Sequence, residues 1–252
     1  MAGAAVHGRL RWLLAQVVAV VEETPRVRSL VLECPGWEGH LPGQHLDIRL
    51  TAEDGYQAQR SYSIATPADG ERVTITVERV DSGEVSPYLT EELRPGDQLE
   101  LRGPIGGYFV WEPAQGGPLQ LIAGGSGLVP LMAMVRSLVD GPNAIPVKLL
   151  TSARSWPELI YRDELERLAN SLPGLEVAYT LTRVQPPGWN GYARRVDRMM
   201  LAESTFPPGQ HPHCYVCGPT GFVEIVSSTL AELGHRQERI RTERFGPTGG
   251  QP

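Results

Sequence analysis

The chain changes character near its middle, and this change limits the folds that are open to it. Up to about residue 112, short apolar and β-branched runs are separated by turn signals. After Gly116-Gly117-Pro118, apolar runs alternate with stretches of helical periodicity. The first pattern is typical of an antiparallel β-barrel and the second of a parallel sheet covered by helices. The sequence therefore predicts two domains, residues 1–113 and residues 114–252.

Six strands are expected in the first domain: Trp12 to Val21, Arg26 to Glu33, His45 to Thr51, Ser61 to Ala65, Arg72 to Val80 and Asp97 to Arg102. The first follows Arg9 and Arg11, but its ten residues are too few to span a bilayer. No small-residue cleavage site follows it, so we interpret it as a strand and expect no membrane span. A short helix is expected between the last two strands, with Ser86 as N-cap and Pro87 at its first position.

Five strands and four helices are expected in the second domain. The strands are Leu119 to Ala123, Val147 to Ser152, Leu175 to Leu181, His213 to Cys217 and Arg239 to Phe245. The helices are Val129 to Val139, Pro157 to Asn170, Arg194 to Glu203 and Thr220 to Leu233. Their alternation predicts a doubly wound parallel sheet with helices on both faces.

Composition excludes several classes of protein. The 23 Lys and Arg residues and 29 Asp and Glu residues give a formal net charge of −6, so nothing in the total charge indicates a nucleic-acid partner. Three cysteines are too few for a disulfide framework, and we expect a reducing cytoplasm.

A glycine-rich turn follows the first strand of the second domain. Gly124-Gly125-Ser126-Gly127-Leu128-Val129-Pro130 would let a pyrophosphate approach the backbone at a helix N-terminus. Its spacing differs from the usual dinucleotide fingerprint, which ends in Gly or Ala. Taken alone, the segment fits a phosphate site and an ordinary strand-to-helix turn about equally well.

Arg60-Ser61-Tyr62-Ser63 stands at the start of a predicted barrel strand. In a strand, Arg60 and Tyr62 share one face and Ser61 and Ser63 the other. Arg provides a forked donor for phosphate and Tyr an aromatic plate. Out of context, an ordinary exposed strand with a cross-strand Arg and Tyr pair is the favoured interpretation of the segment.

Four segments in order identify a family. Arg60-Ser61-Tyr62-Ser63, Gly103-Pro104-Ile105-Gly106-Gly107-Tyr108-Phe109, Gly124 to Pro130 and Cys217-Gly218-Pro219 together resemble the ferredoxin-NADP reductase superfamily. The resemblance covers about residues 9 to 246. It implies an N-terminal flavin-binding barrel followed by a nicotinamide-binding α/β domain, and a flavoprotein that transfers hydride from NAD(P)H to its flavin.

The resemblance also implies residues for the flavin. Within Arg60-Ser61-Tyr62-Ser63, Arg60 would hold a flavin phosphate, Tyr62 would pack on the isoalloxazine, and Ser63 would lie near its N5 atom. Gly83-Glu84-Val85-Ser86 resembles the second phosphate motif. Near the C-terminus, Glu243 would lie beside the rings and Phe245 would cover the flavin. We expect FAD rather than FMN.

For the nicotinamide coenzyme, the resemblance implies Gly125, Ser126 and Gly127 at the pyrophosphate, and Cys217, Gly218 and Pro219 at the nicotinamide. The 2′-phosphate of NADP needs Arg and hydroxyl partners. Ser152, Arg154, Arg183 and Arg195 follow predicted strands, so we expect NADPH rather than NADH. Phe222 departs from the family, in which Met is common at this place, and we interpret it as a packing substitution.

Two short motifs offer a metal or redox alternative to this scheme. Cys214-Tyr215-Val216-Cys217 has the C-x-x-C spacing of a dithiol or half a zinc site. In a strand, however, residues three apart point to opposite faces. His211-Pro212-His213 lacks a second ligand cluster. We therefore expect no metal.

The expected partner is a separate electron acceptor, a ferredoxin or a similar redox protein, because the sequence has no four-cysteine iron–sulfur segment. Two other functions stay open. The protein would act as a flavin reductase if free flavin were its substrate, or as a non-catalytic redox-sensing subunit if the bound flavin were never reduced by nucleotide.

Overall fold

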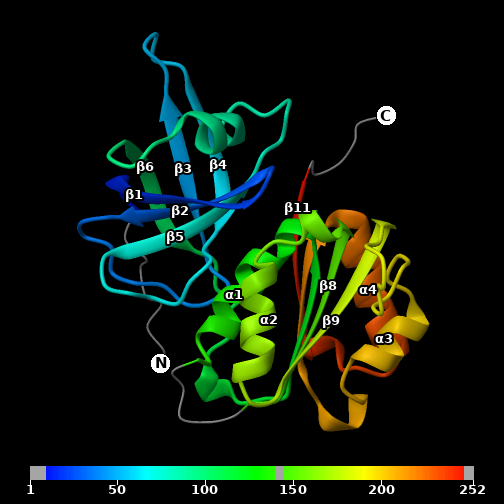
Figure 1. Ribbon diagram of the computed structural model, residues 1–252. Coiled ribbons are helices and arrows are strands. Elements are labelled where there is room, and N and C mark those ends of the chain that lie inside the picture. Colours follow the sequence, from blue (N-terminus) through cyan, green and yellow to red (C-terminus); the bar gives the residue numbers. More distant parts are fainter. Residues whose placement is uncertain (1–9, 140–144, 247–252) are drawn as a thin grey trace, which may run out of the picture.

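A computed structural model describes residues 10–139 and 145–246, which fold into two units (Figure 1). The first is an antiparallel sheet with strand order β4-β3-β6-β1-β2-β5. Its edge strands meet where Ile64 bridges Ile75 and the Ala65 N–H donates to the Thr74 carbonyl at 2.8 Å. The predicted six-stranded barrel is therefore confirmed, with strands β1 (Leu13–Thr24), β2 (Val27–Glu33), β3 (His45–Thr51), β4 (Gln57–Ser63), β5 (Arg72–Glu78) and β6 (Gln98–Ile105).

Side chains point alternately into and out of the barrel along each strand, and the inward-pointing apolar side chains fill its core. Leu30 and Leu32 of β2 and Ile75 of β5 are fully buried in its core, while the residues between them face outward. Strand β4 begins four residues earlier than predicted, because it pairs with the whole of β3, from Thr51 opposite Gln57 to His45 opposite Ser63. The motif that begins at Arg60 thus lies within the strand rather than at its start.

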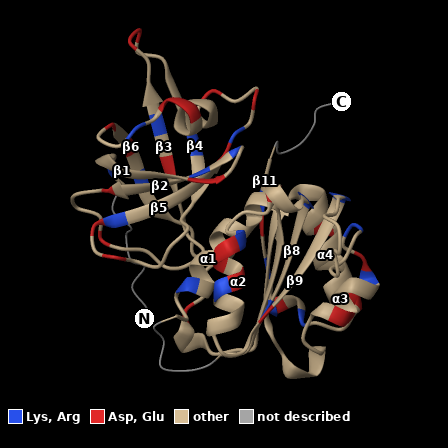
Figure 2. Ribbon diagram, in the orientation of Figure 1, with Lys and Arg blue, Asp and Glu red and all other residues tan. Residues whose placement is uncertain are grey.

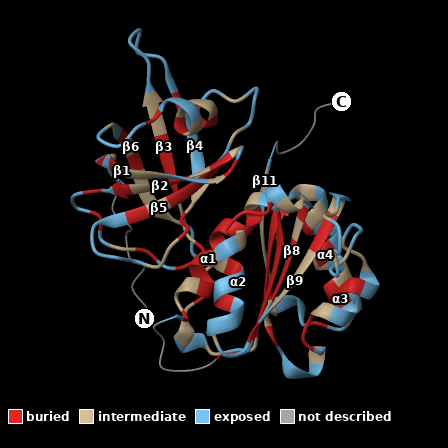
Figure 3. Cartoon of the chain, in the orientation of Figure 1, coloured by how far each residue is buried: buried red, intermediate tan, exposed pale blue. Residues whose placement is uncertain are grey.

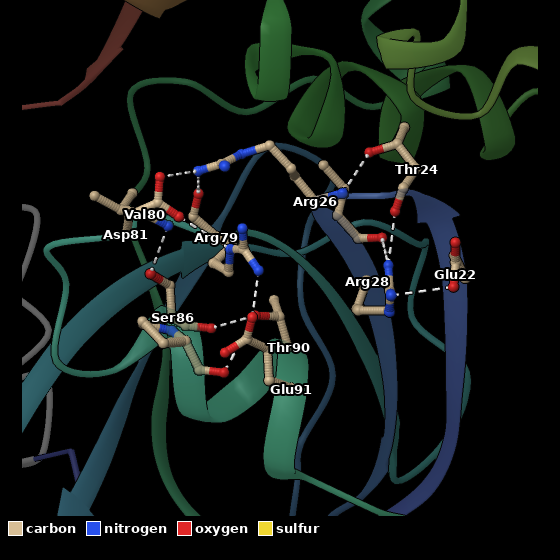
Figure 4. Close-up of polar contacts among 12 residues, drawn as sticks. Glu22, Thr24, Arg26, Arg28, Arg79, Val80, Asp81, Ser86, Thr90 and Glu91 are labelled. Atoms are coloured by element: carbon tan, nitrogen blue, oxygen red, sulfur yellow. Dashed lines mark hydrogen bonds and ion pairs between the residues drawn. The ribbon is translucent and has the colours of Figure 1, made fainter.

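The helix predicted after Ser86 is different in the structure. It is a π-helical turn, η1 (Tyr88–Glu92), which follows Pro87. Ser86 does not cap it, because the Ser86 hydroxyl accepts the Val80 N–H at 3.0 Å instead (Figure 4). The predicted N-cap is therefore wrong. The Val80 N–H, which belongs to a turn, takes the Ser86 hydroxyl in place of the N–H groups of the helix.

The second unit is a parallel sheet with strand order β11-β10-β7-β8-β9. Its strands are β7 (Leu119–Gly124), β8 (Val147–Ser155), β9 (Leu175–Val184), β10 (His213–Pro219) and β11 (Ile240–Phe245). One face packs against α1 (Leu128–Arg136) and α2 (Arg162–Ser171), and the other against α3 (Arg198–Ser204) and α4 (Thr220–Glu232). Helices on both faces confirm the predicted doubly wound sheet.

Two helices begin later than predicted, each for a local reason. Helix α3 begins at Arg198 rather than Arg194, because the Asp197 carboxylate accepts the Met200 N–H at 2.8 Å and caps the helix. Helix α2 begins at Arg162 rather than Pro157, because Tyr161 has a left-handed backbone with φ of 56°.

The two units share a buried contact. Val27 and Ala65 of the barrel pack into the hydrophobic core that α1 and α2 form on the sheet. Figure 3 shows buried residues along the parallel strands and α1, with exposed residues on the outer side of α2. Strand β6 ends at Ile105 and β7 begins at Leu119, so the segment between the units includes the predicted boundary at 113 and 114, which itself stays a prediction.

Charges of both signs are interspersed over the two units in the view of Figure 2. The longest helix in residues 10–139 and 145–246 is α4, with 13 residues, and none there has the length and apolarity needed to cross a membrane.

Candidate functional site

A cavity of about 340 Å³ lies between the barrel and the carboxyl edge of the parallel sheet. Both units contribute to its walls, which are formed by His45, Ser61, Ser63, Cys217, Glu243, Arg244 and Phe245. The structure thus brings together Ser61 and Ser63 of β4 with Cys217 of β10 and the C-terminal strand β11. These segments are far apart in the sequence, and their meeting defines the candidate site.

Cys217 lies at the sheet side of this cavity. Its side chain belongs to the core beneath α1, whereas Cys214 belongs to the core beneath α4, so the prediction that the two point to opposite faces is confirmed. Burial, and then the charge of Glu243, raise the pKa of the Cys217 thiol well above its usual value. The thiol is therefore neutral near pH 7 and suits contact with a ring better than nucleophilic attack.

Glu243 faces Cys217 from β11. Burial raises the pKa of its carboxyl to about 7, because the ionised form loses hydration. Its Oε1 atom lies 3.9 Å from Nδ1 of His45, a residue of β3 whose pKa is lowered mainly by burial. A carboxyl that titrates near neutrality next to an imidazole can hold or release a proton at the cavity wall.

His45 is a site residue that the sequence reasoning missed. It stands opposite Ser63 in the antiparallel pairing of β3 with β4, and this pairing carries its side chain to the cavity. The only sequence signal available was the strand assignment, because the register between two strands cannot be read from either strand alone.

Tyr62 lies on the other side of β4 from the two serines, as alternation predicted, and packs against the barrel core. Burial raises the pKa of its hydroxyl. Among the described residues, the Tyr62 hydroxyl and the Glu243 Oε2 atom are both buried without a hydrogen-bond partner. Buried polar atoms usually have partners, so a polar group bound in the cavity would fit Glu243 Oε2, whereas Tyr62 is not on the cavity wall.

The two predicted phosphate segments meet at the barrel surface. The Arg60 guanidinium lies 3.3 Å from the carboxylate of Glu84, which also accepts the Tyr56 hydroxyl at 2.9 Å. Glu84 belongs to Gly83-Glu84-Val85-Ser86, in which Val85 is fully buried and anchors the segment. Arg60 and this segment are therefore close enough to contact one anion together, although neither forms part of the cavity wall.

The glycine-rich loop joins β7 to α1 through a single turn, η3 (Gly125–Gly127). A Cβ atom on Gly127 would lie 2.2 Å from the carbonyl oxygen of Cys217, so only glycine lets this loop pack against β10. Gly218 and Gly124 are in similarly close contact, since a Cβ on Gly218 would lie 3.2 Å from the Gly124 Cα. The loop and Cys217-Gly218-Pro219 thus meet at the carboxyl edge, where the strand order reverses and α/β sheets bind ligands.

The predicted coenzyme-selecting residues also gather at this edge. Ser152 and Arg154 lie on β8, and Arg183 lies on its neighbour β9. Arg195 follows Tyr192, which bridges Thr180 of β9. All three arginines are exposed, and within the described ranges none of them pairs with a carboxylate.

Known proteins resemble this chain in sequence and in fold. Residues 15–110 match the oxidoreductase FAD-binding domain family, and residues 121–228 match the oxidoreductase NAD-binding domain family. Ferredoxin–NADP reductase B of Sorangium cellulosum is 33% identical over 241 residues, which are 92% of this chain and 96% of that protein.

The glycine betaine monooxygenase reductase subunit of Pseudomonas aeruginosa is 31% identical over 240 residues. This match includes 93% of the chain but only 64% of the length of that subunit. Among solved structures, the FAD/NAD-binding domain of nitric oxide dioxygenase from Vibrio cholerae superimposes with a TM-score of 0.82 at 28% identity, covering 93% of this chain and 99% of that one.

Proposed function

The chain belongs to the ferredoxin–NADP reductase family of flavin-dependent NAD(P)H oxidoreductases, and we propose that it transfers hydride from NADPH to FAD and passes the electrons singly to a separate protein. The observation that carries this proposal is the 340 Å³ cavity, where Ser63 of the flavin motif shares a wall with Cys217 and Glu243. The flavin supplies the hydride-accepting and one-electron chemistry, while the protein binds, orients and tunes it.

In the barrel, Arg60 and the segment from Gly83 to Ser86 would hold the flavin phosphates. The 3.3 Å contact of Arg60 with Glu84 supports this role, because its guanidinium already reaches that segment. Ser61 and Ser63 would meet the ring edge from the cavity side of β4. The resemblance also assigns Tyr62 to the isoalloxazine, although its ring packs against the barrel core on the opposite face of β4.

At the sheet, Gly125, Ser126 and Gly127 would present backbone N–H groups to the coenzyme pyrophosphate. Helix α1 supports this reading, because no side chain caps its N-terminus. Cys217, followed by Gly218 and Pro219, would place a neutral thiol against the nicotinamide.

Over the rings, Glu243 would hold or release a proton, and Phe245 would cover the flavin. A half-buried Phe245 on the cavity wall favours a retained flavin over one that exchanges freely as a substrate.

We favour NADPH over NADH because Ser152, Arg154, Arg183 and Arg195 lie at one edge with exposed guanidinium groups. A 2′-phosphate would pair with such groups, whereas NAD is usually met by a carboxylate at the ribose.

FAD is favoured over FMN by a second pocket of about 600 Å³ in the barrel, next to the Arg60 and Glu84 pair. Its walls include Leu14, Leu50, Tyr56, Ala58, Glu84 and Tyr88, which offer apolar and aromatic surface to an adenosine.

The proposed acceptor is a ferredoxin or a similar redox protein. One relative is named for ferredoxin and another is the reductase subunit of a monooxygenase, which supports a reductase that serves a second protein. The choice of acceptor depends on surface complementarity between the two proteins rather than on the cavity.

The function is tested by anaerobic titration of the purified flavoprotein with NADPH and then NADH, followed by addition of oxidised ferredoxin. We expect NADPH to bleach the visible flavin absorbance and ferredoxin to restore it. Bound flavin that neither nucleotide reduces would contradict the proposal and favour the redox-sensing subunit. Activity only with added free flavin would favour the flavin reductase.

A further inference from the structure

The two units also meet at the outer face of β2 and β5, strands that do not line the cavity. Ser29 of β2 and Thr76 of β5 are paired in the antiparallel register and both face away from the barrel core. Each is only 5% exposed, because the second unit covers them. Two polar side chains are therefore buried between the units, where each needs a hydrogen-bond partner.

A directed chain of hydroxyls crosses this interface. The hydroxyl of Tyr161, from the second unit, donates to Oγ1 of Thr76. The Thr76 and Ser29 hydroxyls are 2.8 Å apart, and Ser29 donates to the Glu23 carboxylate of β1 at 2.6 Å. Because the Ser29 proton goes to Glu23, Thr76 must donate to Ser29. Within this chain, the hydrogen bond that Thr76 accepts therefore comes from Tyr161.

Arg136, the last residue of α1, strengthens the same contact. Its Nε and Nη2 atoms donate to Glu164 of α2 at 2.9 and 2.6 Å, and its Nη1 donates to the Ala65 carbonyl of the barrel. Its guanidinium lies 4.5 Å from the centroid of the Tyr161 ring. Since Ala65 is two residues after Ser63, this contact ties α1 to the strand that carries the flavin motif.

The backbone at Tyr161 is also unusual. Its φ of 56° is in the left-handed region, which disfavours any residue with a side chain. A glycine would adopt this φ without strain but would remove the ring under Arg136 and the hydroxyl that reaches Thr76. The structure thus keeps a strained residue at the point where the second unit contacts the barrel.

We propose that Tyr161 is a positioning residue for hydride transfer, whose bond to Thr76 sets the angle between the barrel and the parallel sheet. That angle fixes the separation of Ser63 and Cys217, which belong to different units. Tyr161 is not on the cavity wall, so it acts through orientation and touches neither ring. The inference rests on the proposed function, because this separation matters only if a hydride crosses the cavity.

The expected effect follows from the steep distance dependence of such reactions. A misplacement of about 1 Å far from the reacting atoms can slow a reaction about a hundredfold. Removal of the Tyr161 hydroxyl leaves the Arg136 contacts to Glu164 and Ala65 in place, so a smaller displacement is expected. We therefore expect hydride transfer in Tyr161→Phe to be slower by roughly tenfold.

The experiment uses the flavin-loaded protein with three single variants and one double variant. Tyr161→Phe removes the donor and Thr76→Val removes the acceptor. Tyr192→Phe is the matched control, since it removes an outer hydroxyl of the second unit that donates to Glu203 at 3.0 Å. The measurements are flavin content, the dissociation constant for NADP⁺, the long-wavelength charge-transfer absorbance with nucleotide, and the anaerobic rate of flavin reduction at saturating NADPH.

The proposal predicts that Tyr161→Phe and Thr76→Val each slow reduction and weaken the charge-transfer band, with unchanged flavin content and nucleotide affinity. The double variant should be no slower than the slower single variant, because both single variants already remove the bond between Tyr161 and Thr76. Tyr192→Phe should match the parent.

Variants that melt at lower temperature but keep the parent rate and band would show a purely structural role and overturn the proposal, as would additive losses in the double variant. If Tyr161→Phe did not fold, Thr76→Val would decide the question, because it leaves the tyrosine in place. A parent protein whose flavin NADPH cannot reduce would overturn the proposed function and this inference with it.

Discussion

Cys217 and Glu243 stand opposite each other in the parallel pairing of β10 with β11, and both side chains face the cavity. Burial raises the pKa of both groups, that of the thiol well above its usual value and that of the carboxyl to about 7. The thiol therefore stays neutral near pH 7, while the carboxyl is the group that gains or loses a proton. One wall of the site thus combines a neutral contact surface with a proton-exchanging group.

Cys217→Ala tests the first of these roles. Loss of the thiol should leave the nicotinamide less well placed and slow anaerobic flavin reduction by roughly tenfold without loss of flavin. The matched control is Cys214→Ala, which removes a buried thiol from the opposite face of the same strand. Stopped-flow bleaching that is unchanged in Cys217→Ala, or slowed equally in the control, would remove Cys217 from the nicotinamide site.

Arg60→Ala tests the flavin phosphate assignment. A hydrogen bond to a charged group contributes about 1.5–3 kcal/mol, so flavin affinity should fall by roughly ten- to a hundredfold. Fluorescence titration of flavin-free protein measures the dissociation constant directly. Arg72→Ala, which removes another exposed barrel arginine, is the control and should bind flavin like the parent. Full flavin retention by Arg60→Ala would contradict the assignment.

Arg154→Ala tests coenzyme selection. If Arg154 contacts the 2′-phosphate, its loss should raise the Michaelis constant for NADPH by about tenfold and leave that for NADH nearly unchanged. Steady-state kinetics with both coenzymes and an artificial acceptor give the two constants. Arg167, an exposed arginine on α2, provides a charge-matched control. Equal effects on the two coenzymes would place Arg154 outside the phosphate site.

Glu243→Gln tests the burial of the carboxyl through the pH dependence of stability. The pKa of Glu243 is raised from 4.5 to about 7 in the folded protein, so the folded state binds more protons than the unfolded state between these values. The free energy of unfolding therefore falls as pH rises through this window. The variant lacks this loss and should be more stable than the parent at about pH 8, on the order of 1–3 kcal/mol.

Below the unfolded-state pKa, both proteins carry a neutral side chain at position 243 and should be equally stable. Urea unfolding of parent and variant at the two pH extremes measures the difference, and His45 is present in both proteins. A variant that gains nothing at high pH would mean that the Glu243 charge is solvated in the folded state.

Much of the fold and the site could be predicted because the deciding signals are local. The change from period-two strands to alternating strands and helices separates the barrel from the parallel sheet. Alternation within β4 also places Ser61 and Ser63 on the cavity side and Tyr62 against the barrel core. The Gly127 contact with β10 is similarly encoded by a single glycine in a short loop.

The features that could not be predicted depend on contacts between residues that are not neighbours within one strand or helix. His45 reaches the site through the β3–β4 register. Ser86 failed as a predicted cap because the Val80 N–H, six residues earlier, takes its hydroxyl. The role of Tyr161 depends on a hydrogen-bond chain through β5, β2 and β1, and no periodicity in the sequence reports such a chain.

The central claim is that hydride passes directly between two rings held in the cavity between Ser63 and Cys217. It is tested most directly by mixing the flavoprotein anaerobically with NADPH that carries deuterium on one or the other face of the nicotinamide C4. We expect the visible flavin absorbance to bleach, with deuterium lost from one face only and a primary isotope effect for that isomer. A flavin that stays oxidised, or deuterium loss from both faces alike, would contradict the account.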